Sequence, residues 1–365
     1  MNFLEKLFKL LTPIPNEGVK PEQIKDTDWI SGKETGIVYE QISDKWEDYL
    51  PKAELQRELF ETYSCVSFTL NNVVETLLNK YIASEKLSKK ALYYLNEKGY
   101  IVNKQVNFSD AYQAIGSGTT KEGNSGSNVC DFTRHNGFIP EAMLPVRGKN
   151  TYDYLYNTKI TPEMYALGKV FFDRIGYELA YEWVLIKDGR KAMDTLKTHL
   201  KQCPLQVFTP LCPDFMKGKN VKTCSTNVLK HSYMIYNIDD IEKLYNAFDQ
   251  YEPFKKTLNK DYPIPYALKI ALIPIKMPDK PIYEWKTSLR QGDSGNDVKA
   301  LQEALVYEGL LNKNLTTGYF GVNTKNAVID FQNIHREEIL YPVGLKDGTG
   351  LVGKSTINYL NKIYK

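Results

Sequence analysis

The chain has 365 residues, a length that allows two domains. Hydrophobic residues make up 42% of it and charged residues 25%, the balance of an ordinary soluble protein. The net charge of +3 is too small to indicate a nucleic-acid partner. No apolar run reaches the length of a membrane span. We therefore expect neither nucleic-acid binding nor stable membrane insertion.

The five cysteines are odd in number, widely spaced and contain no Cys-x-x-Cys pair. This pattern argues against a zinc site, and we expect neither a metal nor a cofactor. Nothing in the pattern requires a disulfide, so a reducing compartment is the simpler assumption for synthesis. The cysteines are Cys65, Cys130, Cys203, Cys212 and Cys224.

The N-terminal stretch is apolar at helical spacing, but lysines and a glutamate interrupt it. It lacks the uninterrupted apolar core of a secretory signal, so we expect synthesis in the cytoplasm without one. Residues 1–21 are interpreted as an amphipathic helix and a linker, docked on the protein's own body rather than on a membrane surface.

A largely buried helix is predicted to begin at Cys65. Apolar residues from Phe68 to Tyr81 fall at a spacing that fits one face of an α-helix. Cys65 then lies in the first turn, where the partial positive charge and free N–H groups favour a thiolate, the nucleophilic form. A small buried core residue is the commoner role for a free cysteine, so the catalytic interpretation depends on partners elsewhere.

The order of the remaining elements indicates an α+β fold. Ser109 and Asp110 start a short helix, and residues 128–135 form another that ends at Asn136-Gly137. Between them lies a glycine-rich loop without a phosphate-binding motif, suited to close approach of a ligand. Further helices are predicted at residues 161–184 and 189–201, and strands at residues 204–209, 231–238, 245–249 and 266–274.

His231 is the histidine best placed to act as a base, because it alone of the four begins a buried-looking strand. A thiol nucleophile needs a base that takes its proton and a third group that orients the imidazole. Asp249, on the next predicted strand, is a candidate for that third group. Taken alone, His231 is more readily interpreted as a structural or surface residue. The catalytic interpretation is supported only when Cys65, His231 and Asp249 are considered together, in this order along the chain.

Three motifs in this order resemble those of papain-like cysteine peptidases. Tyr63-Ser-Cys-Val-Ser-Phe68-Thr resembles the nucleophile helix of the family, and His231-Ser-Tyr-Met-Ile-Tyr resembles its catalytic-histidine strand. Asp249-Gln-Tyr stands where the family has Asn-Ser-Trp, so the orienting residue would be an aspartate. The resemblance covers residues 22–275 and implies a two-lobed fold, with a helical lobe and a β-rich lobe.

The same resemblance implies roles in substrate binding. Gly123-Asn-Ser-Gly126 resembles the glycine-rich substrate lip of the family, so Gly123, Asn124, Ser125 and Gly126 would contact the substrate. Gln56 is the candidate for the oxyanion glutamine, although it precedes the cysteine by more than the family's usual spacing.

The implied reaction is hydrolysis of a peptide bond through an acyl-enzyme. Cys65 and His231 would form a thiolate–imidazolium pair, with Asp249 holding the ring. The backbone N–H of Cys65 and the side chain of Gln56 would stabilise the oxyanion of the tetrahedral intermediate.

A proline-rich, charged stretch precedes a C-terminal region of different composition. Residues 276–286 are interpreted as a linker, and residues 287–365 as a small domain of three short helices. Two similar loops, Gly321-Val-Asn-Thr324 and Gly353-Lys-Ser-Thr356, each lead into a helix that Thr324 or Thr356 is predicted to cap.

The C-terminal region resembles the three-helix peptidoglycan-binding domain of bacterial and phage cell-wall hydrolases. This resemblance implies a bacterial peptidoglycan partner and assigns Tyr319, Phe320 and Asn323 to the binding groove, although capping and core packing explain these residues equally well. An insertion at residues 337–346 lengthens the loop before the last helix. The motifs are Gly292 and Gly295, Leu301-Gln302, Gly318-Tyr-Phe-Gly321 and Phe331-Gln332.

The patterns together favour a monomeric thiol peptidase that acts at the bacterial cell wall, on the peptides of peptidoglycan or on nearby protein. The expected lack of a signal peptide fits a phage-type lysin released by another factor, or a virion component. Three alternatives stay open: a non-catalytic peptidoglycan-binding protein with a degenerate peptidase fold, a general protease anchored at the wall, and a transglutaminase or acyltransferase.

Overall fold

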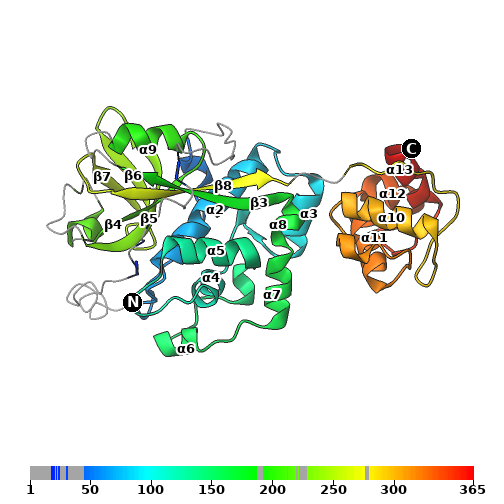
Figure 1. Cartoon of the computed structure of the whole chain (residues 1–365), viewed down its shortest axis with the longest axis horizontal. Coiled ribbons are helices and arrows are strands. Elements are labelled where there is room, and N and C mark those ends of the chain that lie inside the picture. The colour runs from blue at the N-terminus through cyan, green and yellow to red at the C-terminus, as the bar shows by residue number, and fades with distance from the viewer. Residues whose placement is uncertain are drawn as a thin grey trace. The chain divides into compact units, whose positions relative to one another are not determined.

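The computed structural model describes most of the chain (Figure 1). The described residues are 18–20, 22, 24, 30–31, 45–186, 192–211, 213–218, 221, 228–275 and 279–365. Most of the predicted N-terminal helix and linker (residues 1–21), the cysteines Cys212 and Cys224, and residues 276–278 of the predicted linker lie outside them. No helix among the described residues is both long enough and apolar enough to span a membrane.

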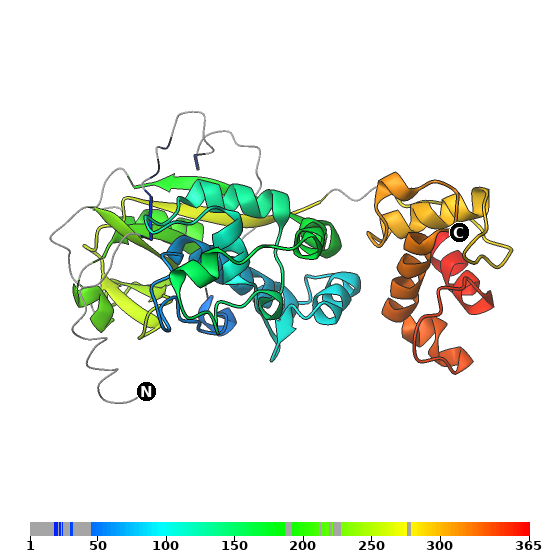
Figure 2. The ribbon, with the colours of Figure 1, turned by 90° about the horizontal axis from the view of Figure 1, so that it is seen from below.

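The chain divides into two compact units, which are described separately (Figures 1 and 2). The larger contains the residues up to Ile273 except for two short segments, Leu87–Leu95 and Phe172–Tyr177, which group with Pro274–Lys365 in the smaller unit. The larger unit combines helices with a sheet, and residues 279–365 are helical, which confirms the α+β class and the all-α C-terminal region. The predicted domain boundaries stay predictions.

Helix α2 (Cys65–Ala83) forms the centre of the larger unit, and nearly all of its residues are buried. The predicted helix is therefore confirmed, but burial extends around its whole circumference instead of one face. Three polar side chains one turn apart connect it to residues 106–110. Asn71 donates to Asp110 at 2.7 Å, while Glu75 and Asn79 accept the backbone N–H groups of Phe108 and Val106.

The helices before residue 176 match the sequence prediction in part: the helices that begin near Ser109 and before Asn128 are confirmed, whereas α3 (Lys89–Glu97) and α6 (Tyr152–Tyr156) were not predicted. Ser109 caps α4 by accepting a hydrogen bond from the backbone N–H of Tyr112 at 3.0 Å. Helix α5 ends at Gly137, whose φ of +61° suits glycine. The remaining elements up to residue 175 are η1 (Glu47–Tyr49), α3 (Lys89–Glu97), β1 (Ile101–Val102), β2 (Gln105–Val106), α4 (Asp110–Gly116), α5 (Gly126–Asn136), η2 (Glu141–Met143), α6 (Tyr152–Tyr156), α7 (Pro162–Lys169) and α8 (Phe171–Ile175).

A six-stranded sheet forms the second half of the larger unit, in the order β3-β8-β4-β5-β6-β7. The four predicted strands are confirmed as β4, β5, β6 and β8, and each pair among β8-β4-β5-β6-β7 is antiparallel. The elements are β3 (Tyr177–Leu185), α9 (Ala192–Leu200), β4 (Leu205–Pro210), η4 (Pro213–Lys217), β5 (Leu229–Asp239), β6 (Leu244–Phe248), β7 (Lys255–Asn259) and β8 (Tyr266–Pro274).

Two parts of the sheet were not predicted. Residues 177–184 form strand β3, so their assignment to a helix is wrong: aromatic and branched side chains here are buried beside β8, and this tertiary contact decides the conformation. Strand β7 begins with Lys255 and Lys256 and has no apolar run, so its sequence carries little strand signal.

Helix α2 packs directly against the sheet, with β5 and β4 on one side and α4 and α5 on another (Figure 1). Gln206 on β4 donates to the backbone oxygen of Val66 at 3.0 Å, which holds the first turn of α2 to the sheet. Because His231 is on β5, this packing brings the start of α2 close to that strand.

The C-terminal helices surround one hydrophobic core. The predicted insertion contains two short helices, α12 and η6, between the second and third main helices. The elements are α10 (Asn296–Tyr307), η5 (Lys313–Leu315), α11 (Val322–Ile334), α12 (Arg336–Ile339), η6 (Tyr341–Val343) and α13 (Lys354–Tyr364). The buried residues of this core include Val298, Leu301, Leu305, Val328, Phe331 and Leu360.

Two buried glutamines hold the repeated loops. Gln302 on α10 donates to the backbone oxygen of Tyr319 at 2.9 Å and to the hydroxyl of Thr324 at 3.0 Å. Its carbonyl accepts the backbone N–H of Gly318 at 2.7 Å. Each glutamine thus satisfies the polar groups of a loop and the first turn of the next helix.

Gln332 on α11 repeats the arrangement one helix later. It donates to the backbone oxygen of Leu351 at 2.7 Å and to the hydroxyl of Thr356 at 2.9 Å, and accepts from the backbone of Gly350 at 3.0 Å. The internal sequence repeat therefore corresponds to a repeated hydrogen-bonding unit.

The predicted capping roles of Thr324 and Thr356 are wrong. Gly321 and Gly353 occupy the N-cap positions, and neither helix has a side-chain cap. The two threonines lie inside the first turn and are buried, since their hydroxyls accept the glutamine amides.

We expect Gln302→Ala to lower the free energy of unfolding of the C-terminal helices by about 2–4 kcal/mol, because it leaves buried backbone groups of the Gly318 loop without partners. Native-state hydrogen exchange of α11 measures the loss. The exposed neighbour Glu303→Ala is the control, with an expected change within about 0.5 kcal/mol. Equal protection of α11 from hydrogen exchange in the two variants would show that Gln302 does not stabilise the Gly318 loop.

Candidate active site

Cys65 is the first residue of α2 and is completely buried. Its sulfur faces the backbone N–H of Ser232, the residue that follows His231. The structure thus brings together the cysteine and histidine segments, which are far apart in the sequence, as the predicted site requires.

Burial raises the pKa of the Cys65 thiol, more than the Ser232 N–H lowers it, and the carboxylates of Glu61 and Asp249 raise it further. Removal from water therefore outweighs the helix N-terminus that was predicted to favour a thiolate. In this arrangement the sulfur is a neutral thiol.

His231 and Asp249 are hydrogen-bonded partners. The Nε2 atom of His231 lies 2.8 Å from Oδ1 of Asp249, and both side chains are almost completely buried. The backbone N–H of Gln250 donates to the same oxygen at 2.8 Å. This contact fixes the orientation of the imidazole, which is the geometry that the predicted third group requires.

The other oxygen of Asp249 faces the ammonium of Lys256 at 3.0 Å. Burial by itself would raise the pKa of Asp249, but the charges of His231 and Lys256 outweigh it and hold this pKa below its ordinary value. Asp249 is therefore ionised in the folded protein.

Aromatic rings shield this hydrogen bond from solvent. The ring of Tyr251 lies 5.2 Å from the His231 ring at 35°, and Phe215 meets the imidazole edge-on at 5.5 Å. Tyr251 stands where the resembling family has tryptophan. Its hydroxyl donates to Glu61 at 2.7 Å, which anchors the ring over the site.

Gln56 is buried, but its amide is already engaged. Its Nε2 donates to Oε1 of Glu61 at 2.6 Å, and its backbone N–H donates to the oxygen of Gln250 at 3.1 Å. The oxyanion role of Gln56 stays a prediction, since it requires a second N–H of an amide that Glu61 already holds.

Three residues around the site were not predicted: Glu61, Gln250 and Lys256. The Gln250 amide donates to the backbone oxygen of Ser232 at 2.8 Å and approaches that of Cys65 at 3.4 Å, so it links β5 to the start of α2. Only the position of Gln250 directly after Asp249 could have suggested it. No sequence motif marks the positions of Glu61 and Lys256.

The predicted substrate lip surrounds the start of α5. Asn124 is buried and held by Ser117 and Thr119, and Ser125 caps the helix. A Cβ atom at Gly126 would lie 2.6 Å from a methyl group of Leu268, so packing alone requires glycine there. The substrate-contact roles of the four lip residues stay predictions.

A short N-terminal segment covers the lip. The backbone N–H of Lys20 donates to the oxygen of Asn124 at 2.8 Å, and the N–H of Asn124 donates to Gly18 at 3.2 Å. Val19 forms a parallel β-bridge with Asn124 and is buried. The backbone of the lip thus binds an extended peptide, here the protein's own.

The same segment lies against the sulfur. A Cβ atom placed on Gly18 would be 2.3 Å from Sγ of Cys65, closer than atoms can approach. Glu22 holds the segment by accepting the backbone N–H of Ser127 at 2.7 Å. Gly18 therefore contributes to the burial that raises the pKa of the Cys65 thiol.

The predicted groove residues of the C-terminal region separate into two kinds. Tyr319 is 53% exposed and Asn323 is exposed, so both remain available to a ligand. Phe320 is completely buried in the core, and its place in a binding groove is corrected to core packing.

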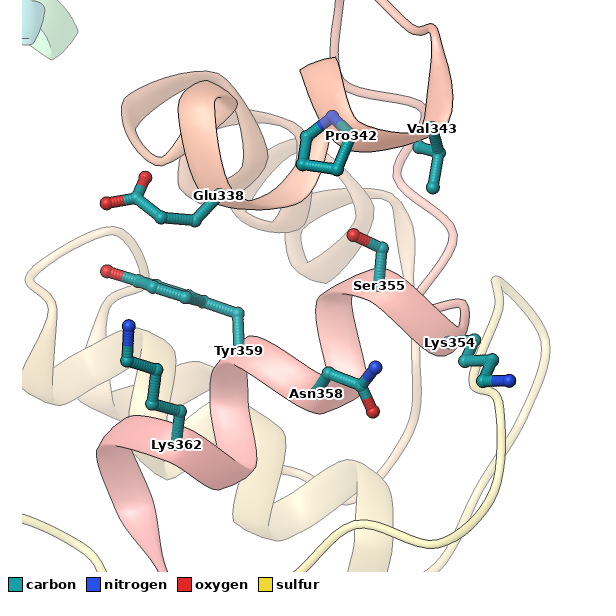
Figure 3. Close-up of a pocket in the computed structure, with 8 residues that line it drawn as sticks. All are labelled: Glu338, Pro342, Val343, Lys354, Ser355, Asn358, Tyr359 and Lys362. Carbon is teal, nitrogen blue, oxygen red and sulfur yellow. The ribbon is translucent and has the colours of Figure 1, made fainter.

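A pocket of about 450 Å³ lies between the insertion and α13 (Figure 3). Glu338 and Lys362 reach towards the ring of Tyr359, whose hydroxyl bonds Nδ1 of His335 at 2.9 Å. The lining residues are Glu338, Pro342, Val343, Lys354, Ser355, Asn358, Tyr359 and Lys362. The insertion thus adds a hollow with a mixed polar and apolar lining beside the three-helix core.

Residues 294–337 match the sequence model of the family described as "Putative peptidoglycan binding domain". An 81-residue stretch is 38% identical to the type VI secretion system spike protein VgrG3 of Vibrio cholerae. That match covers 21% of this chain and 8% of the spike protein, so the chain spans less than a tenth of that relative.

Similar solved structures are papain-like cysteine proteases. Xylellain from Xylella fastidiosa is 12% identical, with 71% of this chain and 96% of that one covered and a TM-score of 0.46. Procathepsin L2 from Tenebrio molitor is 15% identical over 74% and 82%, with a TM-score of 0.46. Bromelain from Ananas comosus is 13% identical over 63% and 97%, with a TM-score of 0.38.

We expect Gly18→Leu to displace the N-terminal segment, since the new side chain overlaps the sulfur. Alkylation of Cys65 by iodoacetamide at pH 8 should then accelerate at least about tenfold, because a solvated thiol ionises more readily. Peptide mapping by mass spectrometry separates Cys65 from Cys130 and Cys203, which are also free and buried.

The control is Lys20→Ala in the same segment, whose side chain faces exposed Glu122 at 4.0 Å. It should leave the alkylation rate close to that of the unaltered protein. If Cys65 of the Gly18→Leu variant is alkylated as slowly as in the unaltered protein, the N-terminal segment does not limit access of the reagent to the sulfur.

Proposed function

We propose that this protein is a cysteine peptidase that acts on the bacterial cell wall. The observation that carries the proposal is the buried set in which Cys65 at a helix start faces the strand of His231, and His231 is hydrogen-bonded to Asp249. The match of residues 294–337 to a peptidoglycan-binding family supports the location of the substrate.

The proposed reaction begins when the N-terminal segment leaves the lip. His231 takes the proton of Cys65, and the thiolate attacks the carbonyl carbon of the scissile bond. The backbone N–H of Cys65 holds the oxyanion, while His231 returns the proton to the leaving amine as the C–N bond breaks. Water then attacks the thioester, with His231 as base, and frees the second product.

Asp249 has two roles in this mechanism. Its hydrogen bond to Nε2 of His231 leaves Nδ1 as the atom that exchanges the proton with the sulfur, and its charge stabilises the imidazolium. The extended pairing of Asn124 with Val19 supports a substrate that binds as a strand along the lip.

We further propose that the C-terminal helices hold the enzyme on peptidoglycan through the surface that bears Tyr319 and Asn323. The substrate class is then the peptide stems or cross-bridges of the wall, as in a phage-type lysin or a virion-associated peptidase. A general protease anchored at the wall would share the same two parts and differ only in what it cleaves.

We expect Cys65→Ala and His231→Ala each to lower peptide cleavage at least about a thousandfold, since each removes a group that bonds the reacting atoms. The unaltered protein should release free amines from purified cell wall. Cys203→Ala, another buried free cysteine, is the matched control and should stay within a few-fold of the unaltered protein.

Activity that survives either active-site substitution would reject the assignment. Cleavage of casein but not of wall would favour the general protease. Binding to wall without amine release in the unaltered protein would favour a non-catalytic wall-binding protein.

We expect the double substitution Tyr319→Ala/Asn323→Ala to weaken retention on purified peptidoglycan about tenfold, because exposed aromatic and amide side chains provide stacking and hydrogen bonds to sugars and peptides. Co-sedimentation of the full chain carrying Cys65→Ala measures binding without cleavage. Lys313→Ala/Asn314→Ala, on the exposed η5 turn, is the control. Unchanged retention would place the binding surface elsewhere.

A further inference from the structure

Lys256 is a buried lysine beside the proposed active site. It lies on β7 next to Lys255, and the two side chains point to opposite faces: Lys255 is exposed, while Lys256 is 1% exposed. Lysine is rarely buried without a charged partner, because desolvation of the ammonium is costly. Its partner here is Asp249, at 3.0 Å.

The remaining contacts of Lys256 satisfy its ammonium. It donates to the backbone oxygens of Tyr251 at 2.6 Å and Pro253 at 2.5 Å, and it lies 5.2 Å from the centre of the Phe215 ring. Asp249 follows the end of β6 and Lys256 lies near the start of β7, so the turn between the two strands brings them together.

The two oxygens of Asp249 have different partners. Oδ1 accepts hydrogen bonds from His231 and from the backbone of Gln250. Oδ2 faces the ammonium of Lys256 at 3.0 Å, and this contact compensates that side of the carboxylate.

We propose that Lys256 is a positioning residue of the site proposed above, acting through Asp249 on His231. Its positive charge partly offsets the field of the carboxylate at the His231 ring, and the ion pair as a whole has a net charge of zero. This is the charge of the asparagine amide that stands here in the resembling family. The ion pair thus lets an aspartate orient the ring without holding a proton on it permanently.

The net charge of the ion pair predicts the direction in which each substitution changes the protonation of His231. Removal of Lys256 leaves an extra negative charge in a buried site, which favours the protonated forms of both His231 and Cys65. Removal of the Asp249 charge leaves an extra positive charge with the opposite effect. A charge within about 4–6 Å of a titratable group shifts the pKa of that group by about one unit or more.

The other titratable groups facing this site are the same in every variant. They are Tyr233 from β5, Tyr251 from the turn, Tyr262 before β8, and Glu61 before α2. Burial raises the pKa of each of these tyrosines above its ordinary value of about 10, so none of them ionises near neutral pH.

The experiment is an NMR titration of the His231 ring in the full chain, assigned with His231→Gln, for Lys256→Met, Asp249→Asn and the double variant. We expect the midpoint to rise by about one pH unit in Lys256→Met, to fall in Asp249→Asn, and to return to the original value when both charges are removed. Lys255→Met is the matched control, because its ion pair with Glu47 is exposed.

Cleavage of wall peptides gives the second readout. Each single substitution should cost about 10- to 100-fold in kcat/KM at the optimum of the unaltered protein, and the double variant should recover to within about fivefold. The pH–activity profile should move with the NMR midpoint in each variant.

The outcomes separate the two proposals. An inactive unaltered protein rejects the peptidase, while its NMR titration still tests the ion pair. Midpoints that do not move, or a double variant that is worse than both single ones, would overturn the role of Lys256. If Lys256→Met does not fold, greater thermal stability of the double variant than of Asp249→Asn supports charge compensation, and lower stability contradicts it.

Discussion

The hydrogen bond between His231 and Asp249 is the contact on which the candidate site depends. Both partners are buried, so the carboxylate needs compensation in a medium that solvates charge poorly. The turn after β6 and the start of β7 supply it: Gln250 donates its backbone N–H, Lys256 on β7 brings the opposite charge, and Tyr251 covers the ring. The Gln250 amide then links this turn to β5 and approaches the start of α2.

The second constraint is exclusion of water from the sulfur. Gly18 contacts Cys65 so closely that only glycine fits, and Val19 pairs with the backbone of the lip at Asn124. Burial raises the pKa of the Cys65 thiol, which lowers the fraction present as the nucleophilic thiolate. The contacts that occupy the lip are backbone hydrogen bonds, which any extended peptide can replace. The proposed substrate and the segment would therefore compete for one surface.

In the C-terminal region, two buried side chains hold the glycine-rich loops against a small hydrophobic core. Gln302 and Gln332 each bind one loop and the first turn of the next helix. The buried amides replace the side-chain caps that the helices lack, which leaves the side chains at the loop tips, such as Tyr319, free to face outward.

The sequence by itself determined the features that depend on neighbouring residues: the helix after Cys65, the cap at Ser109, four strands of the sheet and the three C-terminal helices. Periodicity and capping act within a few residues, so they can be interpreted without the fold. Only the tertiary structure decided that residues 177–184 form a strand, that Phe320 belongs to the core, that Glu61 holds Gln56, and that Gly18 and Lys256 meet the proposed catalytic residues. These outcomes depend on long-range packing, burial and charge pairing, and such contacts leave no local pattern in the chain.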